Sequence, residues 1–94
     1  MSKKFDSVPV EVDTKILSSN VSKLGKYDVL YQLWSWDGIN GESLVFAAKD
    51  IAGLDDINLE KEVRKSPVVK SGSEITINRS GSGFVFVSFS FKSD

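Results

Sequence analysis

The clearest alternation of apolar and polar residues lies in the last third of the chain. Two alternating segments, 73–79 (SEITINR) and 84–92 (FVFVSFSFK), flank a short Ser/Gly linker. A loop with an odd number of residues gathers the apolar side chains on one face of the pair, whereas an even number mixes apolar with polar side chains. We therefore predict a hairpin with an odd loop and a Gly in the left-handed conformation. The expected cross-strand pairs are Ile77 with Val87, Ile75 with Phe89, Thr76 with Ser88 and Glu74 with Ser90.

A second hairpin is predicted in the middle of the chain, where both Tyr and both Trp residues lie. Its first strand, Tyr27–Trp36, has apolar side chains on both faces, which is typical of a central strand covered on both sides. Asp37-Gly38 and Asn40-Gly41 follow, and both dipeptides favour tight turns because these residue types tolerate positive φ. A two-residue turn at Asn40-Gly41 would pair Trp36 with Val45. A four-residue loop leaves the same side chains on each face.

The remaining segments give weaker signals. Residues 8–12 alternate and predict a strand, which Pro9 places at a sheet edge or at the strand's beginning. Residues 44–52 fit the second strand of the hairpin, or alternatively a helix that Ser43 caps and Gly53 ends. A short helix with an Asn58 cap is predicted over 59–65, a short strand at 68–70, and loops over the polar residues 18–20 and 22–25.

These elements predict a mainly β protein. The expected architecture is a small antiparallel β-sandwich or barrel of five to six strands with at most one or two short helices. The alternative is an α+β sheet with one helix packed on a face. A length of 94 residues is that of one domain, so residues 1–94 are expected to form a single β-rich domain. Within it, residues 1–7 are expected to be a frayed terminus with Phe5 as an anchor.

Composition narrows the chemistry. The chain has no Cys and no His, which removes disulfides, thiolate chemistry and the side chain that most often serves in acid–base catalysis and metal binding. The net charge is −1 with interspersed signs, which argues against a strong binder of nucleic-acid backbones. No apolar stretch is long enough for a bilayer, and the basic start lacks the apolar run of a secretory signal. We therefore expect a soluble cytoplasmic protein without a cofactor or metal.

The acidic residues offer one route to catalysis in a chain without His or Cys, beside Ser–Lys and Thr chemistry. Two carboxylates can act as acid and base in glycoside hydrolysis if burial raises the pKa of one of them. A small domain offers little such burial, so we interpret these residues as solvated turn and cap residues and predict no enzymatic activity. The residues in question are Asp37, Glu42, Asp50, Asp55 and Asp56.

Four aromatic residues are the candidate binding residues. Trp34 and Trp36 lie two apart, on one face of their strand, and an exposed pair of this kind can stack on a ligand or anchor an interface. Phe84 and Phe86 fall on the polar face of the C-terminal hairpin, where they would form an exposed apolar patch. Under the alternative interpretation, the indoles close the core and the N-terminal segment covers the two Phe rings.

These observations predict a non-enzymatic interaction module, of the accessory, assembly or inhibitor type. Its partner is expected to be another protein or a second copy of the chain. The first alternative is a protein that binds carbohydrate or another small ligand on Trp34 and Trp36. The second is a small barrel that binds single-stranded nucleic acid, which the near-neutral charge disfavours.

Overall fold

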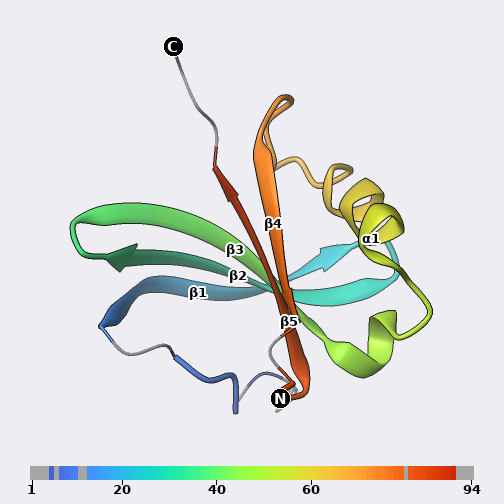
Figure 1. Ribbon diagram of the computed structural model, residues 1–94, viewed down its shortest axis with the longest axis horizontal. Coiled ribbons are helices and arrows are strands. Elements are labelled where there is room, and N and C mark those ends of the chain that lie inside the picture. Colours follow the sequence, from blue (N-terminus) through green and yellow to red (C-terminus); the bar gives the residue numbers. More distant parts are fainter. Residues whose placement is uncertain (1–4, 6, 11–12, 80, 91–94) are drawn as a thin grey trace.

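The computed structural model describes residues 5, 7–10, 13–79 and 81–90, which are built around one antiparallel sheet. The spatial order of the strands is β1-β2-β3-β5-β4, so β1 and β4 form the two edges (Figure 1). The mainly β prediction is confirmed, and the described strands form a single open sheet with a helix beside it, the arrangement expected as the alternative. The elements are β1 (Thr14–Leu24), β2 (Tyr27–Trp36), β3 (Ile39–Ala47), the 3-10 turn η1 (Ala48–Ile51), α1 (Asp56–Val63), β4 (Glu74–Arg79) and β5 (Phe84–Ser90).

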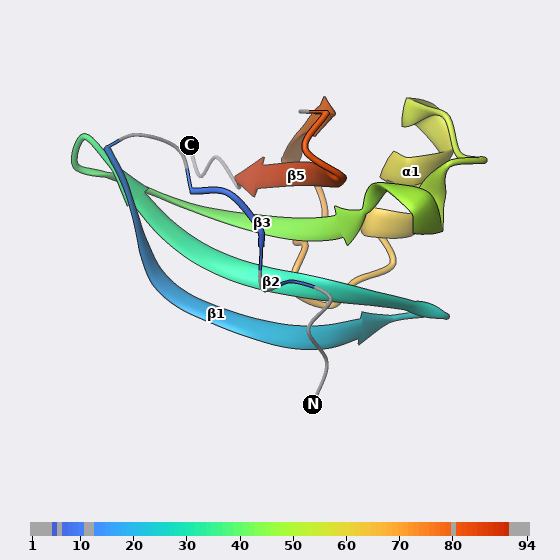
Figure 2. The same cartoon turned by 90° about the horizontal axis from the view of Figure 1, so that it is seen from below.

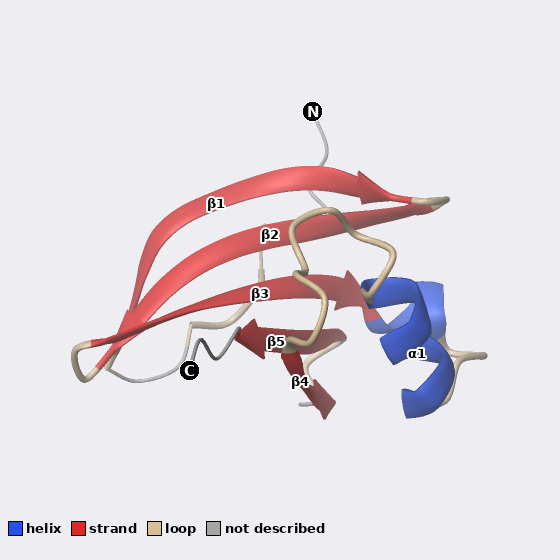
Figure 3. Ribbon diagram, turned by 90° about the horizontal axis from the view of Figure 1, so that it is seen from above, coloured by secondary structure: helices blue, strands red, loops and turns tan. Residues whose placement is uncertain are grey.

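The sheet is strongly twisted, and different parts of the chain lie on its two faces. In Figure 1, β4 and β5 run across the direction of β1 and β2. Figure 3 shows α1 and the loop that leads to β4 on one side of the sheet. Figure 2, drawn from the opposite side, shows the N-terminal segment in front of the strands. We call these two sides the helix face and the N-terminal face.

The larger core lies on the helix face. Alternate residues of β2, β3 and β5 point into it because side chains alternate along a strand. Phe46 is fully buried there, and its ring meets that of Tyr27 edge-on at a centroid distance of 6.1 Å. The buried members of this core are Leu24, Val29, Leu44, Phe46, Ile51, Leu59, Val63, Val69, Val85, Val87 and Phe89.

A smaller core lies on the N-terminal face. Phe5 is buried against the sheet, with its ring centroid 6.2 Å from that of Phe84. Leu30 and Val45 complete the buried cluster. The prediction that Phe5 is an anchor is therefore confirmed, although residues 1–4 and 6 lie outside the described part of the chain.

The C-terminal hairpin has the predicted register. All four expected cross-strand pairs are present, from Glu74 opposite Ser90 to Ile77 opposite Val87. Gly81 and Gly83 in the connecting loop both have positive φ. The odd loop is confirmed because only this register separates an apolar face from a polar one.

The central hairpin has the predicted first strand but a different turn. Asp37 and Gly38 have φ values of 49° and 78°, the positive values at both central positions that define a primed turn. Trp36 therefore pairs with Ile39, and the predicted pairing with Val45 is wrong; Val45 lies opposite Leu30. The allocation of side chains to the two faces is nevertheless as predicted, because the shift in register is an even number of residues.

The N-terminal third differs most from the prediction. Residues 18–20 and 22–24, predicted as loops, belong to β1. Their polar side chains suit an edge strand, and ten of the eleven β1 residues are partly buried or exposed, with only Leu24 buried. Residues 8–10 are not a strand, so the strand predicted over residues 8–12 is wrong there. Residues 11–12 lie outside the described part of the chain.

The helix begins earlier than predicted. Asp55 is its N-cap and accepts a hydrogen bond from the Asn58 backbone N–H at 2.8 Å, where the sequence suggested Asn58 as the cap. Leu59 and Val63, one turn apart, are both fully buried, as their spacing predicted.

Two other segments were uncertain from the sequence. Residues 44–47 belong to β3, which settles the alternative in favour of a strand, and a 3-10 turn follows at 48–51. No strand forms at 68–70.

Candidate binding site on the N-terminal face

A row of polar side chains crosses the N-terminal face of the sheet. The pairing places Gln32 of β2 opposite Ser43 of β3, Ser43 opposite Ser88 of β5, and Ser88 opposite Thr76 of β4. Residues directly opposite each other in antiparallel strands lie on the same face, so the four side chains form one continuous row. We call this the polar row. The polar row lies next to the smaller core on the same face of the sheet, so the apolar side chains of that core do not extend across the whole face.

Trp34 lies beside the polar row and is tied to it. Its indole Nε1 donates a hydrogen bond to Ser43 Oγ at 2.8 Å, and Ser43 Oγ lies 3.1 Å from Ser88 Oγ. The six-membered ring of Trp34 lies over Gly41, its cross-strand partner, and a Cβ at that position would overlap the ring. The lack of a side chain at Gly41 thus allows the indole to lie along the sheet, with its polar edge satisfied.

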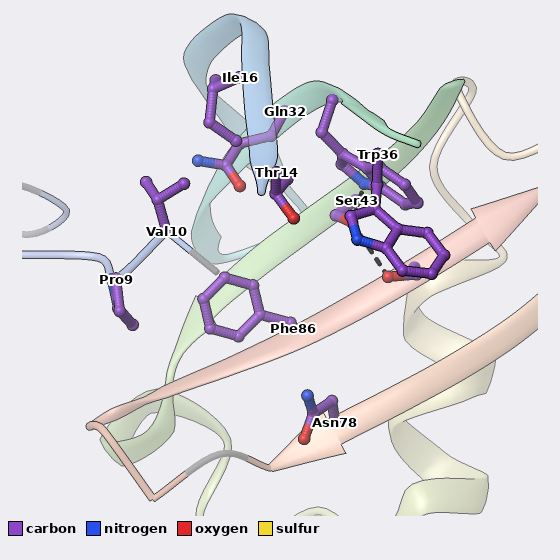
Figure 4. A pocket seen from close by; sticks show the side chains of 11 residues that line it. Pro9, Val10, Thr14, Ile16, Gln32, Trp36, Ser43, Asn78 and Phe86 are labelled. Atoms are coloured by element: carbon purple, nitrogen blue, oxygen red, sulfur yellow. Dashed lines mark hydrogen bonds between the residues drawn. The ribbon is translucent and has the colours of Figure 1, made fainter. Parts of the chain in front are cut away.

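One wall of a pocket with a volume of about 280 Å³ is formed by Trp34 and by three residues of the polar row, Gln32, Ser43 and Ser88. The volume lies just below the range of about 300–1,000 Å³ that holds drug-sized ligands, so the pocket suits a smaller group such as an individual side chain. None of the described residues that line the pocket is charged. Figure 4 shows the pocket between the N-terminal segment and β2, β3 and β5. Its lining residues are Pro9, Val10, Thr14, Ile16, Gln32, Trp34, Trp36, Ser43, Asn78, Phe86 and Ser88.

Three of the four aromatic residues predicted from the sequence come together at this pocket. Trp34 is partly buried in its wall, Trp36 is 49% exposed at its rim, and Phe86 lies partly buried on the other side. Phe84 does not join them. It is only 7% exposed and packs on Phe5, so for this residue the interpretation as a covered core side chain is the one that the structure supports.

The acidic residues are dispersed rather than gathered at the pocket. Asp37 lies in the β2–β3 turn, Asp55 caps α1, and Asp56 Oδ1 accepts a hydrogen bond from Arg79 Nε at 2.9 Å. Among the described residues, no group of three or more potential metal ligands is close enough to hold an ion. Asp37 and Asp55 thus have the turn and cap roles expected from the sequence, whereas Glu42 lies partly buried in β3 and one carboxylate oxygen of Asp50 is fully buried, so the expectation of solvated turn or cap residues is wrong for these two.

A second, wider depression lies on the helix face. Leu33, Glu42 and Lys70 are among the residues that line it. The Tyr31 hydroxyl donates a hydrogen bond to Glu42 Oε1. Burial, together with this bond and the negative charge of Glu42, raises the pKa of Tyr31 to about 12, so the phenol stays protonated at neutral pH. This depression differs from the first pocket in containing charged groups, and Trp34 and Phe89 are among its lining residues.

Neither a protein-family model nor a curated protein nor a solved structure matches the chain. The site must therefore be understood from its own residues. In the described part of the chain, none of the helices has the length and apolar character needed to cross a membrane.

The polar residues of the pocket were not predicted from the sequence. Gln32 is only 7% exposed, although it stands between Leu30 and Trp34 on the N-terminal face of β2. A polar residue that interrupts an apolar face of a central strand is the signal that could have identified it. Ser43 could not be found in this way, because its pairing depends on which of the two turn dipeptides closes the hairpin.

Proposed function

We propose that the chain is a non-enzymatic interaction module that binds a short segment of another protein in the pocket on the N-terminal face. The observation that carries this proposal is the pocket itself: it is small, uncharged in its described lining and walled by Trp34, Trp36 and Phe86. Side chains of this kind supply much of the binding energy at protein interfaces. The proposal assigns the module no catalytic step.

The arrangement of the indoles supports a preformed site. The hydrogen bond from Trp34 to Ser43 and the close approach to Gly41 hold one indole in place before any partner arrives. Trp36 adds a large apolar surface at the rim of the pocket, and about half of this surface is in contact with solvent. Covering that surface would contribute favourably to binding, and a fixed Trp34 would lose little conformational entropy.

Carbohydrate binding is the second candidate function, and one observation favours it. The exposed indole of Trp36 stands beside neutral hydrogen-bonding groups, Gln32 and Asn78, at the same pocket. A sugar ring could stack on the indole and use those groups for its hydroxyls. The apolar side chains around the amide of Gln32, including Val10 and Ile16, suit a peptide side chain better than a sugar, and we therefore place a protein segment first.

Self-association and cytoplasmic location stay predictions. The edge strands β1 and β4 have one unpaired side each within the described sheet, which would allow a second chain to extend it.

Replacing Trp36 with Ala should weaken partner binding. We suggest selecting peptides from a displayed random library on the immobilised protein and measuring the Kd of the selected peptides in solution. Loss of a half-exposed anchor at the pocket rim should raise Kd by about tenfold or more. Ile57→Ala is the matched control, because Ile57 is a large apolar residue that is 70% exposed on α1, away from the pocket.

Equal affinity of the wild type and the Trp36→Ala variant for every selected peptide would contradict the proposal. If no peptide is selected but neutral oligosaccharides bind in a manner that depends on Trp36, carbohydrate binding replaces it. An equal loss in the Ile57→Ala variant would show that the effect does not come from this pocket.

A further inference from the structure

Gln32 is a polar side chain in a position that favours an apolar one. It lies in β2, inside the sheet, and is 7% exposed. A carboxamide carries two N–H donors and a carbonyl acceptor, and removing them from water without new hydrogen bonds costs stability. The other members of the polar row do not bring this cost: Thr76 is exposed, Ser43 and Ser88 are joined to each other, and Ser43 also accepts from Trp34.

The carboxamide of Gln32 has no hydrogen-bond partner among the described residues. Its nitrogen and oxygen are nevertheless not sealed inside the protein, since neither is among the fully buried unpaired atoms. Figure 4 shows the group beside Val10, Thr14 and Ile16, with the ring of Phe86 across the pocket. The donor and acceptor of Gln32 are thus available to a group that enters the pocket.

We infer that the pocket takes up a carboxamide, the end group of an Asn or Gln side chain, and pairs it with the carboxamide of Gln32. A carboxamide presents an N–H and a C=O side by side, so two of them form a pair of hydrogen bonds. A carboxylate lacks the donor, and its charge would be buried among neutral groups. An apolar end group would leave Gln32 unpaired. This inference rests on the proposed function and specifies the partner: an uncharged segment with Asn or Gln beside an apolar residue.

Three blocked tripeptides test this preference on the wild-type protein. The peptides are acetyl-Leu-X-Leu-dimethylamide with Gln, Glu or Met as X, which have similar length; the dimethylamide has no N–H, so the Gln side chain is the only primary carboxamide in the set. Binding is followed by nuclear magnetic resonance, using the side-chain amide signals of Gln32 and the indole signals of Trp34 and Trp36. The Gln peptide should bind about fivefold or more tightly than the other two, as expected for a buried pair of hydrogen bonds. Its binding should shift the Gln32 side-chain signals.

The variant Gln32→Met tests the role of the residue directly. Met has a similar size and flexibility, so the pocket should keep its shape while the carboxamide is lost. The preference for the Gln peptide should disappear in this variant, and the Met peptide should bind at least as well as the Gln peptide. The wild-type comparison stands on its own if the variant does not fold.

The outcomes separate this inference from the proposed function. If all three peptides bind the pocket equally, or if none binds, the carboxamide preference is overturned; the peptide selection on Trp36→Ala still decides the proposed function. A further ligand, propionamide, carries the carboxamide without a peptide chain and tests whether a small molecule is sufficient. If it binds as tightly as the Gln peptide and needs Gln32, the carboxamide site is supported, but the ligand is a small molecule and the proposed protein partner is contradicted.

Discussion

Phe46→Ala should lower the free energy of unfolding by about 3–5 kcal/mol, which is the usual cost of emptying a buried Phe site. Phe46 is fully buried in the middle of the larger core, between β2 and β5, and contacts the ring of Tyr27. The domain is small, and domains of this size have a total stability of roughly 5–10 kcal/mol. The variant should therefore be close to unfolded at moderate temperature.

The measurement is chemical denaturation followed by Trp fluorescence, with thermal unfolding in parallel. A loss of this size corresponds to a fall in Tm of roughly 15–30 °C for a domain of about 100 residues. Ile57→Ala, which removes an exposed side chain from α1, should change stability by no more than about 0.5 kcal/mol. A Phe46→Ala variant as stable as this control would show that the core of the helix face is not where we place it.

Gly41→Ala should cost about 1–3 kcal/mol, the range for overpacking a close contact, and should disturb the pocket. The added Cβ would overlap the six-membered ring of Trp34, so the indole must move and its hydrogen bond to Ser43 must lengthen or break. The backbone at Gly41 does not have positive φ, so Ala is not disfavoured by its own conformation. The cost should therefore come from the contact with Trp34 alone.

A double-mutant cycle tests that origin. In a Trp34→Ala background the ring is absent, and Gly41→Ala should become neutral or slightly stabilising, because Gly within a strand is unfavourable. The two substitutions should show a coupling energy of about 1–2 kcal/mol, which is in the range for residues in contact. Additive effects would mean that the indole does not lie over Gly41. Trp34 would then not form this wall of the pocket.

The strands that alternate cleanly were the ones that the sequence predicted well. In the C-terminal hairpin, only one register puts Ile75 and Ile77 with Val87 and Phe89, so burial determines the pairing. In the central hairpin, Asp37-Gly38 and a second dipeptide, three residues later, both suit a tight turn. Local turn preference does not distinguish the two dipeptides. The predicted pairing of β2 with β3 was therefore wrong, although the side chains were assigned to the correct faces of the sheet.

The edge strand β1 could not be read from hydrophobicity. Its Ser and Asn residues remain largely in contact with solvent, because an edge strand can be held by backbone hydrogen bonds without burying its side chains. The available sequence signal for the turn between β1 and β2 was Gly25. Gly readily adopts a positive φ, and Gly25 has a φ of 59° in the turn that pairs Leu24 with Tyr27.

The candidate site was predicted only in part. The aromatic residues were recognisable from the sequence, because indoles and exposed Phe rings are notable wherever they occur. Which of them lie together depends on the cover supplied by Phe5, far away in the sequence, which buries Phe84 and leaves Phe86 at the pocket. The environment of Gln32 depends in the same way on the N-terminal segment and on β1. The pattern of apolar and polar residues predicted the wrong secondary structure for both segments.

The most direct test of the central claim is a resonance-shift map of the wild-type protein as a selected peptide is added. If the pocket on the N-terminal face is the binding site, the largest shifts should be those of the Trp36 indole and the Gln32 side-chain amide, which line this pocket and not the depression, with α1 unchanged. Shifts that centre instead on the depression of the helix face, around Lys70 and Glu42, or on α1, would contradict it.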